Sequence, residues 1–326
     1  MKGRSMLRDY LSPDFTIIAA DETYGARSIE SLRRSLWRRV AGKRIIIHCR
    51  PEHTIQCIFA LDGVVKEAVL APFDACDKFI RMVEGHINAD YVLVDESTRE
   101  GGWLAQELPI EGAGGSDHFG PELETTWLIA TSGTTSTPKL VAHGVDSLCR
   151  TVSKKYSPED VWGLLYDPSR FAGLQVLIQA AAIGSSLVVP DPEDTFSSRV
   201  RFLADSACTA LSATPSLWRK ILMSIGDDCS MELKQVTLGG EIADQAIIDT
   251  LKFQFPGAVI VHIYASTEAG VGFSVRDKRA GFPSVWLEEG PRDVDLKVSE
   301  LGTLLLRSKI RTQRYFGLDE EIIEED

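Results

Sequence analysis

The segment "TSGTTSTPK", residues 131–139, contains hydroxyl side chains at six positions, together with one glycine, one proline and one lysine. Such a segment cannot form core, because nearly every side chain in it requires water or a polar ligand. Apolar residues flank it on both sides, in "WLIA" (127–130) and "LVAH" (140–143). We therefore predict a strand, a polar loop and a second strand. Backbone N–H groups, hydroxyl groups and one ammonium group can wrap polyphosphate oxygens, although ordinary surface hairpins have a similar composition.

The loop departs from the P-loop of nucleotide kinases. Gly133 and Lys139 have the separation of G-x-x-x-x-G-K, but Pro138 replaces the second glycine and Leu140 replaces the Ser or Thr that would hold Mg²⁺. The segment after the lysine reads as a strand, whereas a P-loop opens a helix. A P-loop kinase is therefore disfavoured.

Composition excludes several classes of protein. The chain has 326 residues, of which 44% are hydrophobic, enough for a substantial core. A net charge of −12 without a long basic run argues against nucleic acid or an anionic membrane as the main partner. No apolar run is long enough to span a bilayer, and no signal peptide is evident. The six cysteines form no C-x-x-C pair, so we expect reduced thiols in a cytoplasmic protein.

Two successive alternations of helices and strands organise the chain. In the first, helical spacing covers residues 28–42 and the segment 52–66, while 43–49 and 89–95 read as strands. From about residue 157 a second alternation begins. Its expected helices are 173–184, 195–205, 214–226 and 243–255, and its expected strands are 185–190, 208–213, 233–240 and 258–266.

Alternation of this kind predicts an α/β fold whose parallel sheets are covered on both faces. We predict two stacked α/β subdomains, 1–156 and 157–275, with mainly parallel sheets. Residues 276–326 are expected to form a short antiparallel, β-barrel-like segment that ends in an acidic tail.

Two strand ends of the second subdomain carry polar residues. "LGGE" (238–241) closes one expected strand and "YASTEAG" (264–270) closes the next. Ligands bind at the carboxyl ends of strands in open α/β sheets. Glu268 could hold Mg²⁺ there, with phosphates supplying other ligands. Taken singly, the first segment also reads as a glycine turn and the second as a helix cap.

In this order, the three segments resemble the motifs of the adenylate-forming acid ligases. This family includes acyl- and aryl-CoA synthetases, luciferases and the adenylation domains of nonribosomal peptide synthetases. "TSGTTSTPKLV" resembles the family's phosphate loop, "LGGE" its adenine-side strand end and "YASTEAG" its Tyr-Gly-x-Thr-Glu motif. The resemblance extends from about Glu124 to Gly317, where "GTLLLRS" and "QRYFG" resemble the strand before the ribose-binding motif.

The resemblance implies ATP-dependent activation of a carboxylic acid to acyl-AMP, followed by transfer to coenzyme A or to the phosphopantetheine of an acyl carrier protein. It implies Lys139, Thr267 and Glu268 as catalytic residues, with Thr267 at the α-phosphate and Glu268 on Mg²⁺. The implied phosphate-binding residues are Thr131, Ser132, Gly133, Thr134, Thr135, Ser136 and Lys139. The residues implied to frame adenine and the back of the acyl slot are Gly239, Gly240, Glu241, Tyr264, Ala265 and Ser266.

The sequence departs from the family pattern at several positions. Ser136 and Leu140 stand where the family usually has glycine, and Ala265 adds a methyl group that would narrow the acyl slot modestly. The family's ribose-binding Gly-Asp motif and its small mobile domain are not expected within this chain. We therefore expect weak binding of ATP or acyl-adenylate and very slow turnover, because rotation of the small domain links the two half-reactions.

Two alignments of the acyl-pocket region remain open. "YDPS" (166–169) fits an amino-acid-activating pattern in which Asp167 would pair with the substrate ammonium group, although Asp167 also suits a turn before Pro168. The longer match, 170–184, resembles the acyl-CoA synthetase helix and places Phe171 and Gly173 near the pocket. It favours an acyl- or aryl-acid ligase.

Two further alternatives remain. His143 either neighbours the site or is a solvated strand-end histidine. A non-catalytic protein that binds a nucleotide or an acyl-adenylate is the alternative of another class.

Overall fold

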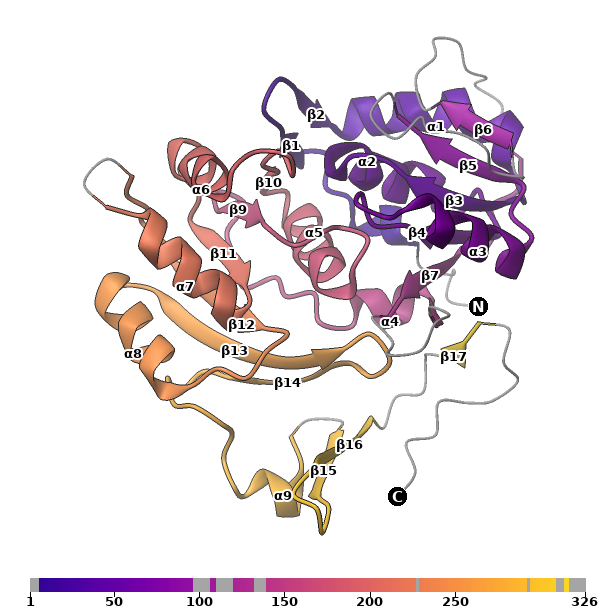
Figure 1. Ribbon diagram of the computed structural model, residues 1–326. Coiled ribbons are helices and arrows are strands. Elements are labelled where there is room, and N and C mark those ends of the chain that lie inside the picture. Colours follow the sequence, from indigo (N-terminus) through magenta and orange to yellow (C-terminus); the bar gives the residue numbers. More distant parts are fainter. Residues whose placement is uncertain are drawn as a thin grey trace.

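Two large β-sheets form the framework of the chain, and a short two-stranded sheet follows them (Figure 1). The computed structural model describes residues 6–95, 106–109, 120–131, 139–226, 229–291, 294–308 and 314–316. Both large sheets are mainly parallel, and the short sheet is antiparallel. The predicted α/β class, with mainly parallel sheets and a small antiparallel part near the end of the sequence, is confirmed.

The first sheet has the strand order β17-β8-β7-β4-β3-β5-β6. Its strands are β3 (Arg44–His48), β4 (Glu67–Leu70), β5 (Tyr91–Val94), β6 (Gln106–Pro109), β7 (Thr126–Ala130), β8 (Leu140–His143) and β17 (Arg314–Tyr315). Three consecutive isoleucines in β3 are fully buried, Ile45 and Ile47 in one core cluster and Ile46 in another. Both faces of this sheet are therefore covered, α1 (Ala26–Val40) and α2 (Pro51–Leu61) packing on one face and α3 (Asp77–Ile87) on the other.

The second sheet has the strand order β14-β13-β12-β11-β9-β10-β1-β2. Its strands are β1 (Thr16–Ile18), β2 (Thr23–Gly25), β9 (Val161–Leu164), β10 (Ser186–Val188), β11 (Ala210–Ala213), β12 (Gln235–Gly239), β13 (Val259–Ser266) and β14 (Gly270–Val275). The helices α6 (Phe196–Asp205), α7 (Pro215–Ser224) and α8 (Gln245–Gln254) share a core cluster that covers one face of this sheet.

Helix α5 (Phe171–Ile183) lies in the core between the two sheets, next to the short helix α4 (Val145–Cys149). Apolar residues occur on nearly every side of α5, as expected for a helix that is buried all round. Its left-handed C-cap at Gly184 has φ of 77°, a conformation that favours glycine. The expected helix at 173–184 is thus confirmed, with its start two residues earlier.

The first two strands of the chain join the second sheet. The sequence analysis instead assigned all of residues 1–156 to the first subdomain. β1 pairs in parallel with β10 and antiparallel with β2, while α1 and the following elements build the first sheet. The strands β1 and β2 have only three residues each, too few to show an alternating pattern. The predicted helix at 52–66 is too long, because α2 ends at Leu61 and strand β4 begins at Glu67.

The segment after β14 carries a short helix and a β-ribbon. These elements are α9 (Trp286–Glu289), β15 (Val294–Val298) and β16 (Leu304–Ser308). Leu296 and Leu306 pack against Phe273 of β14 in a small separate cluster. The described part of this segment is therefore a two-stranded antiparallel sheet, and β17 returns to pair with β8 of the first sheet.

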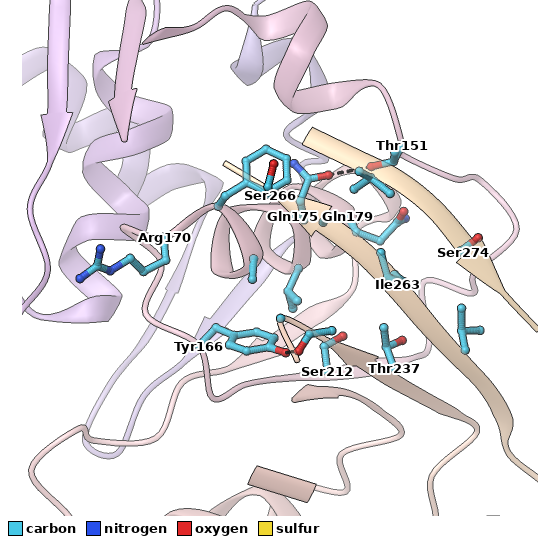
Figure 2. A pocket seen from close by; sticks show the side chains of 18 of the residues that line it. Thr151, Tyr166, Arg170, Gln175, Gln179, Ser212, Thr237, Ile263, Ser266 and Ser274 are labelled. Atoms are coloured by element: carbon cyan, nitrogen blue, oxygen red, sulfur yellow. Dashed lines mark hydrogen bonds between the residues drawn. The ribbon is translucent and has the colours of Figure 1, made fainter. Parts of the chain in front are cut away.

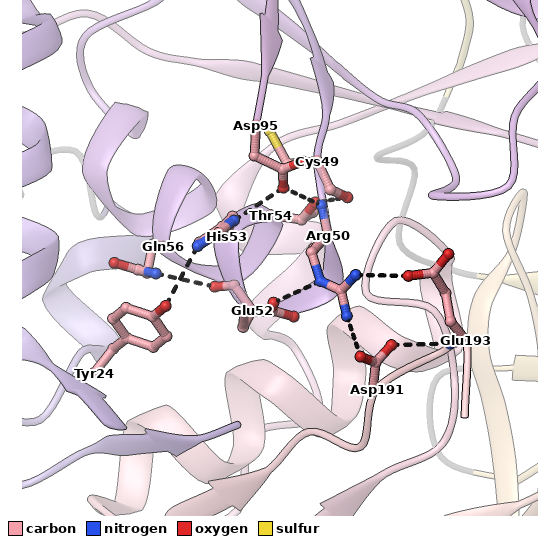
Figure 3. Close-up of polar contacts among 10 residues, drawn as sticks. All are labelled: Tyr24, Cys49, Arg50, Glu52, His53, Thr54, Gln56, Asp95, Asp191 and Glu193. Carbon is pink, nitrogen blue, oxygen red and sulfur yellow. Dashed lines mark hydrogen bonds and ion pairs between the residues drawn. The ribbon is translucent and has the colours of Figure 1, made fainter. Parts of the chain in front are cut away.

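A cluster of charged residues joins the two sheets where several strands end (Figure 3). We call it the Arg50 cluster, and its members are Tyr24, Arg50, Glu52, His53, Asp95, Asp191 and Glu193. Arg50 follows β3, and its guanidinium group contacts Asp191 and Glu193, which follow β10 of the second sheet. Asp95 follows β5, is 2% exposed and accepts hydrogen bonds from the Arg50 backbone N–H at 2.6 Å and from His53 at 2.9 Å. These contacts tie the first sheet to the second.

Candidate functional site

A cavity of about 620 Å³ lies between α5 and the face of the second sheet (Figure 2). Side chains of β11 to β14 line one side of it, and Phe171, Gln175 and Gln179 of α5 line the other. Successive residues of a strand point to opposite faces, so alternate positions of these strands line the cavity. Gln235, Thr237 and Gly239 of β12 follow this period of two.

The polar loop 131–139 begins and ends as predicted. The backbone N–H of Thr131 donates to the Lys139 carbonyl at 2.9 Å, and Ala130 pairs with Leu140 across the two strands. Thr131 lines the cavity. Lys139 is exposed, and its ammonium nitrogen lies 4.9 Å from the ring centroid of Tyr315. The expected phosphate contacts Ser132, Gly133, Thr134, Thr135 and Ser136 lie outside the described residues.

Thr267 and Glu268 occupy the turn between β13 and β14, at the carboxyl end of β13 as predicted. The Ser266 hydroxyl accepts a hydrogen bond from the Ala269 N–H at 2.9 Å, and Gly270 has φ of 70°. Thr267 and Glu268 line the same cavity as Thr131. Two segments more than a hundred positions apart in sequence therefore meet at one cavity.

His143, the last residue of β8, lies near the Thr267 backbone. It is 0% exposed, stacks on Phe171 at 5.5 Å between ring centroids and shares a hydrogen bond of 3.0 Å with the Ser147 hydroxyl. Burial lowers the pKa of His143 to about 4, although the nearby Thr267 backbone partly opposes this effect. His143 is therefore a buried neutral histidine beside the site, and the alternative of a solvated strand-end histidine is wrong.

Only part of the "LGGE" segment lines the cavity. Gly239 and Gly240 line the cavity, and Gly240 has φ of 80°, which a glycine adopts without strain. The Glu241 carboxylate instead accepts hydrogen bonds from the Ser216 hydroxyl at 2.6 Å and the Ser216 N–H at 3.0 Å. These hydrogen bonds at the start of α7 lower the pKa of Glu241. Glu241 thus lies outside the lining of the cavity.

Two consecutive residues at the end of β13 line the cavity, next to a register shift in the β13–β14 pair. The shift falls between Tyr264 and Ala265, and both Ala265 and Ser266 line the cavity. The extra residue of this bulge is Gly272 of β14, which is paired with no residue of β13. Tyr264 lies outside the lining. One face of its ring stacks on Phe273 with centroids 5.3 Å apart, and the residue remains 41% exposed.

The expected acid-binding residues occupy different places. Phe171 lines the cavity, but Asp167 and Gly173 do not. The Asp167 carboxylate accepts hydrogen bonds from the N–H groups of Ser169 at 2.7 Å and Phe73 at 3.3 Å. A β-carbon on Gly173 would lie 2.1 Å from the Asp167 carbonyl oxygen. Asp167 therefore closes a turn, and Gly173 allows α5 to pack against that turn.

Several lining residues were missed by sequence reasoning, because they come from elements that only the fold brings together. Arg170 lines the cavity near the polar loop, where its guanidinium group donates to the Ala130 carbonyl at 3.2 Å. Farther along, the missed polar residues are Ser153, Gln175, Gln179, Ser212, Gln235, Thr237, Ser274 and Arg276. Ser153 and Arg276 lie outside strands and helices, and the only sequence signal of the others is a polar side chain inside an otherwise apolar strand or helix.

Comparisons with known proteins identify the fold and a family. Residues 55–304 match the family described as AMP-binding enzyme. No curated protein sequence matches the chain significantly. Since the solved structures described next are at most 16% identical to this chain, their likeness supports the fold alone.

Of three such structures, two carry adenylation or CoA-synthetase names. One is the N-terminal subdomain of Klebsiella oxytoca NpsA in complex with 3-hydroxybenzoyl-AMSN (16% identity, TM-score 0.70, covering 84% of this chain and 75% of that one). Another is NpsA-ThdA, an artificial adenylation–PCP fusion from the same organism (15% identity, TM-score 0.75, covering 94% of this chain and 69% of that one). The third is Bacillus subtilis MenE, an o-succinylbenzoate CoA synthetase, in complex with its acyl-adenylate intermediate (15% identity, TM-score 0.72, covering 96% of this chain and 70% of that one).

Proposed function

Because this chain belongs to the AMP-binding enzyme family, we propose that it activates a carboxylic acid with ATP, forming acyl-AMP and pyrophosphate. One observation carries this proposal: Thr131, at the base of the polar loop, and Thr267 and Glu268, in the β13–β14 turn, line a single cavity. On this basis we assign the triphosphate to the space between the loop and the turn, and the acid to the cavity beyond the turn.

The reaction requires two anions to approach each other. A carboxylate oxygen of the acid attacks the α-phosphorus of ATP, and the bond from that phosphorus to the pyrophosphate oxygen breaks. Catalysis of such a step consists mainly of charge neutralisation and alignment. We assign the β- and γ-phosphates to the polar loop with Lys139, and the α-phosphate to the hydroxyl of Thr267. Lys139 would turn from the Tyr315 ring toward the phosphates.

Glu268 suits Mg²⁺ held together with phosphate oxygens. Within the described residues, no group of three or more His, Cys, Asp or Glu side chains is placed to hold a metal ion by itself. Mg²⁺ commonly binds through one or two carboxylates, with substrate phosphates and water as the other ligands. Mg²⁺ would supply charge neutralisation at the phosphates.

We assign adenine to the edge formed by β12 and β13. Gly239 and Gly240 lack side chains there, so a planar base can approach the backbone. Tyr264 has one ring face occupied by Phe273, and at 41% exposure it can offer the other face for stacking.

The acid would extend from Thr267 along the cavity. Phe171, Val176, Ile263 and Val271 give the middle of the cavity an apolar lining that suits an acyl or aryl group. Because the Asp167 carboxylate is bonded to the N–H groups of Ser169 and Phe73 and does not line the cavity, an acyl- or aryl-acid ligase is favoured over an amino-acid-activating domain. Thioester formation with coenzyme A or a carrier-protein phosphopantetheine is the second step that we propose.

The alternative of another class is a protein that binds an acyl-adenylate without turning it over. Exchange of labelled pyrophosphate into ATP, assayed with fatty, aryl and amino acids, distinguishes the two. We expect slow but acid-dependent exchange that Glu268→Gln abolishes. Nucleotide binding without any exchange would favour the non-catalytic binding protein. Exchange with amino acids alone would overturn the assignment to acyl or aryl acids.

Two findings bear on where the protein acts. Among the described residues, no helix has the length and apolar character needed to cross a membrane. All six cysteines are free thiols, five of them buried. Free thiols are typical of reducing compartments, and we propose a cytoplasmic location on that ground.

A further inference from the structure

The cavity has two chemically different ends, and the far end suggests which acid it accepts. Thr267 and Glu268 mark the near end. Along β13, Ile263 lies three residues from Ser266 and Val261 lies five, which places them about 10 Å and about 16 Å away at the rise of a strand. Ile263 pairs with Ser274 of β14, and Arg276 follows two residues later on the same face. Figure 2 shows Ser266 and Ser274 toward opposite sides of the cavity.

Hydrogen-bond donors at the far end are not used within the described protein. The hydroxyls of Ser212 and Ser274 have no described hydrogen-bond partner. The Thr237 oxygen accepts from the Gln235 amide at 3.0 Å, so its own O–H remains able to donate. The indole N–H of Trp162, a lining residue that is only 4% exposed, is buried without a described hydrogen-bond partner.

The glutamines of α5 show the opposite behaviour. The Gln179 side chain bonds both backbone groups of Ser153 at 2.8 Å. Gln175 accepts from Thr151 at 2.7 Å and donates to the Leu148 carbonyl at 2.9 Å. These amides hold the loop 151–153 over the cavity, so the donors that remain for a ligand come from the sheet.

Arg276 gives the far end a positive charge. It lines the cavity, is exposed, and has no ion pair with any described residue. Glu268, at the near end, is the one acidic residue among the described lining residues. The far end thus offers a guanidinium group and several hydroxyl donors, and no carboxylate lies among them. Such a set suits an anionic ligand group that accepts hydrogen bonds, and Arg recognises carboxylates particularly well.

We propose that the acid activated at this site carries a second carboxylate, which Arg276 and the hydroxyls of Ser212, Thr237 and Ser274 bind at the far end. This inference rests on the proposed function, since it presumes that the first carboxylate is activated near Thr267. The apolar middle of the cavity then contacts the chain or ring that joins the two carboxylates. Simple fatty acids lack the group that would bond these donors. The Ser212 hydroxyl belongs to a buried residue, and leaving it without a partner is unfavourable.

Calorimetry with three probes tests this selectivity on the whole chain. The probes are sulfamoyladenosine, its octanoyl conjugate, and its suberyl conjugate, which has the same chain length but ends in a carboxylate. We expect the suberyl conjugate to bind at least about tenfold more tightly than the octanoyl conjugate. In Arg276→Gln the two conjugates should bind within about threefold of each other, with the octanoyl affinity unchanged.

Two controls make the result decisive. Arg279→Gln removes an exposed arginine that does not line the cavity and should preserve the preference. Arg276→Glu should reverse the preference in favour of a conjugate that ends in an amine. Equal affinities in the original chain, or a preference that survives Arg276→Gln, would overturn the dicarboxylate inference. Failure of sulfamoyladenosine itself to bind would instead overturn the proposed function, and the inference with it.

Discussion

The Arg50 cluster and the cavity both gather polar groups beside the carboxyl ends of strands, yet they use those groups differently. In the Arg50 cluster one guanidinium group meets three carboxylates, from Glu52, Asp191 and Glu193, and the buried Asp95 accepts two hydrogen bonds. In the cavity Glu268, Arg276 and several hydroxyl groups have no described protein partner. Polar groups that bind one another stabilise the fold, whereas groups that line a cavity without a protein partner are available to a ligand.

The largest effect should come from breaking the Arg50 cluster at its most buried member. Asp95→Ala leaves the Arg50 N–H and the His53 ring without their acceptor, and we expect a loss of about 4 kcal/mol in the free energy of unfolding. Urea denaturation measures this loss, with the exposed Asp74→Ala as control. Affinity for Mg·ATP should not change. Unaltered stability would show that the Arg50 cluster does not stabilise the fold. Loss of nucleotide binding in a chain that stays folded would show that the cluster takes part in binding.

A pH titration should reveal the buried histidine beside the cavity. His143 has a pKa of about 4 in the folded chain and an ordinary value of 6.5 when unfolded, so protonation favours unfolding between these values. Stability is therefore complete above about pH 6.5 and should fall by about 3 kcal/mol as the pH reaches 4. His143→Gln should remove that part of the pH dependence, whereas the exposed His86→Gln should retain it. An unchanged slope in His143→Gln would refute the buried neutral state.

Removing the cavity's carboxylate should change binding and not stability. Glu268→Gln is expected to weaken Mg·ATP binding about thirtyfold, equivalent to about 2 kcal/mol, because the amide is a poor ligand for Mg²⁺. The exposed Glu159→Gln serves as the control. The difference between the variants should vanish when Mg²⁺ is chelated. A loss of affinity that persists in the chelator would show that Glu268 does not act through the metal.

The smallest effect concerns the histidine of the Arg50 cluster, and its sign is opposite to that of His143. Burial alone would lower the pKa of His53, but the hydrogen bond and charge of Asp95 outweigh burial and raise it. Protonated His53 therefore stabilises the folded chain fully below about pH 6.5, and this contribution is lost as the pH rises through the higher folded pKa. Unfolding of His53→Gln, measured from pH 6 to pH 9, should lack this decline. A decline of equal size in the variant would assign it to another group.

Local sequence patterns predicted much of the fold and supplied the candidate residues of the site. The isoleucine strand at 43–49, the apolar helix α5 and the glycine-ended strand β12 each carry their own signal of burial or of a turn. Thr131, Thr267 and Glu268 could be assigned to one site because their segments match family motifs. These segments line one cavity, and the proposed site rests on that observation.

The remainder depends on contacts between distant segments. Asp167 was a candidate for binding an ammonium group because of its neighbours in sequence, yet the nearby N–H groups of Ser169 and Phe73 engage it first. Arg276 and Trp162 gave no local signal, since they reach the cavity only through the pairing of β9, β11, β12, β13 and β14. The strands β1 and β2 were missed because three residues are too few to show a period.

A crystal structure of the chain with Mg·ATP tests the central claim most directly. We predict the triphosphate between the 131–139 loop and the β13–β14 turn, with Lys139 bonded to phosphate oxygens and the Glu268 carboxylate on Mg²⁺. Nucleotide bound elsewhere would contradict it, for example in the smaller cavity of about 300 Å³ beside Arg50.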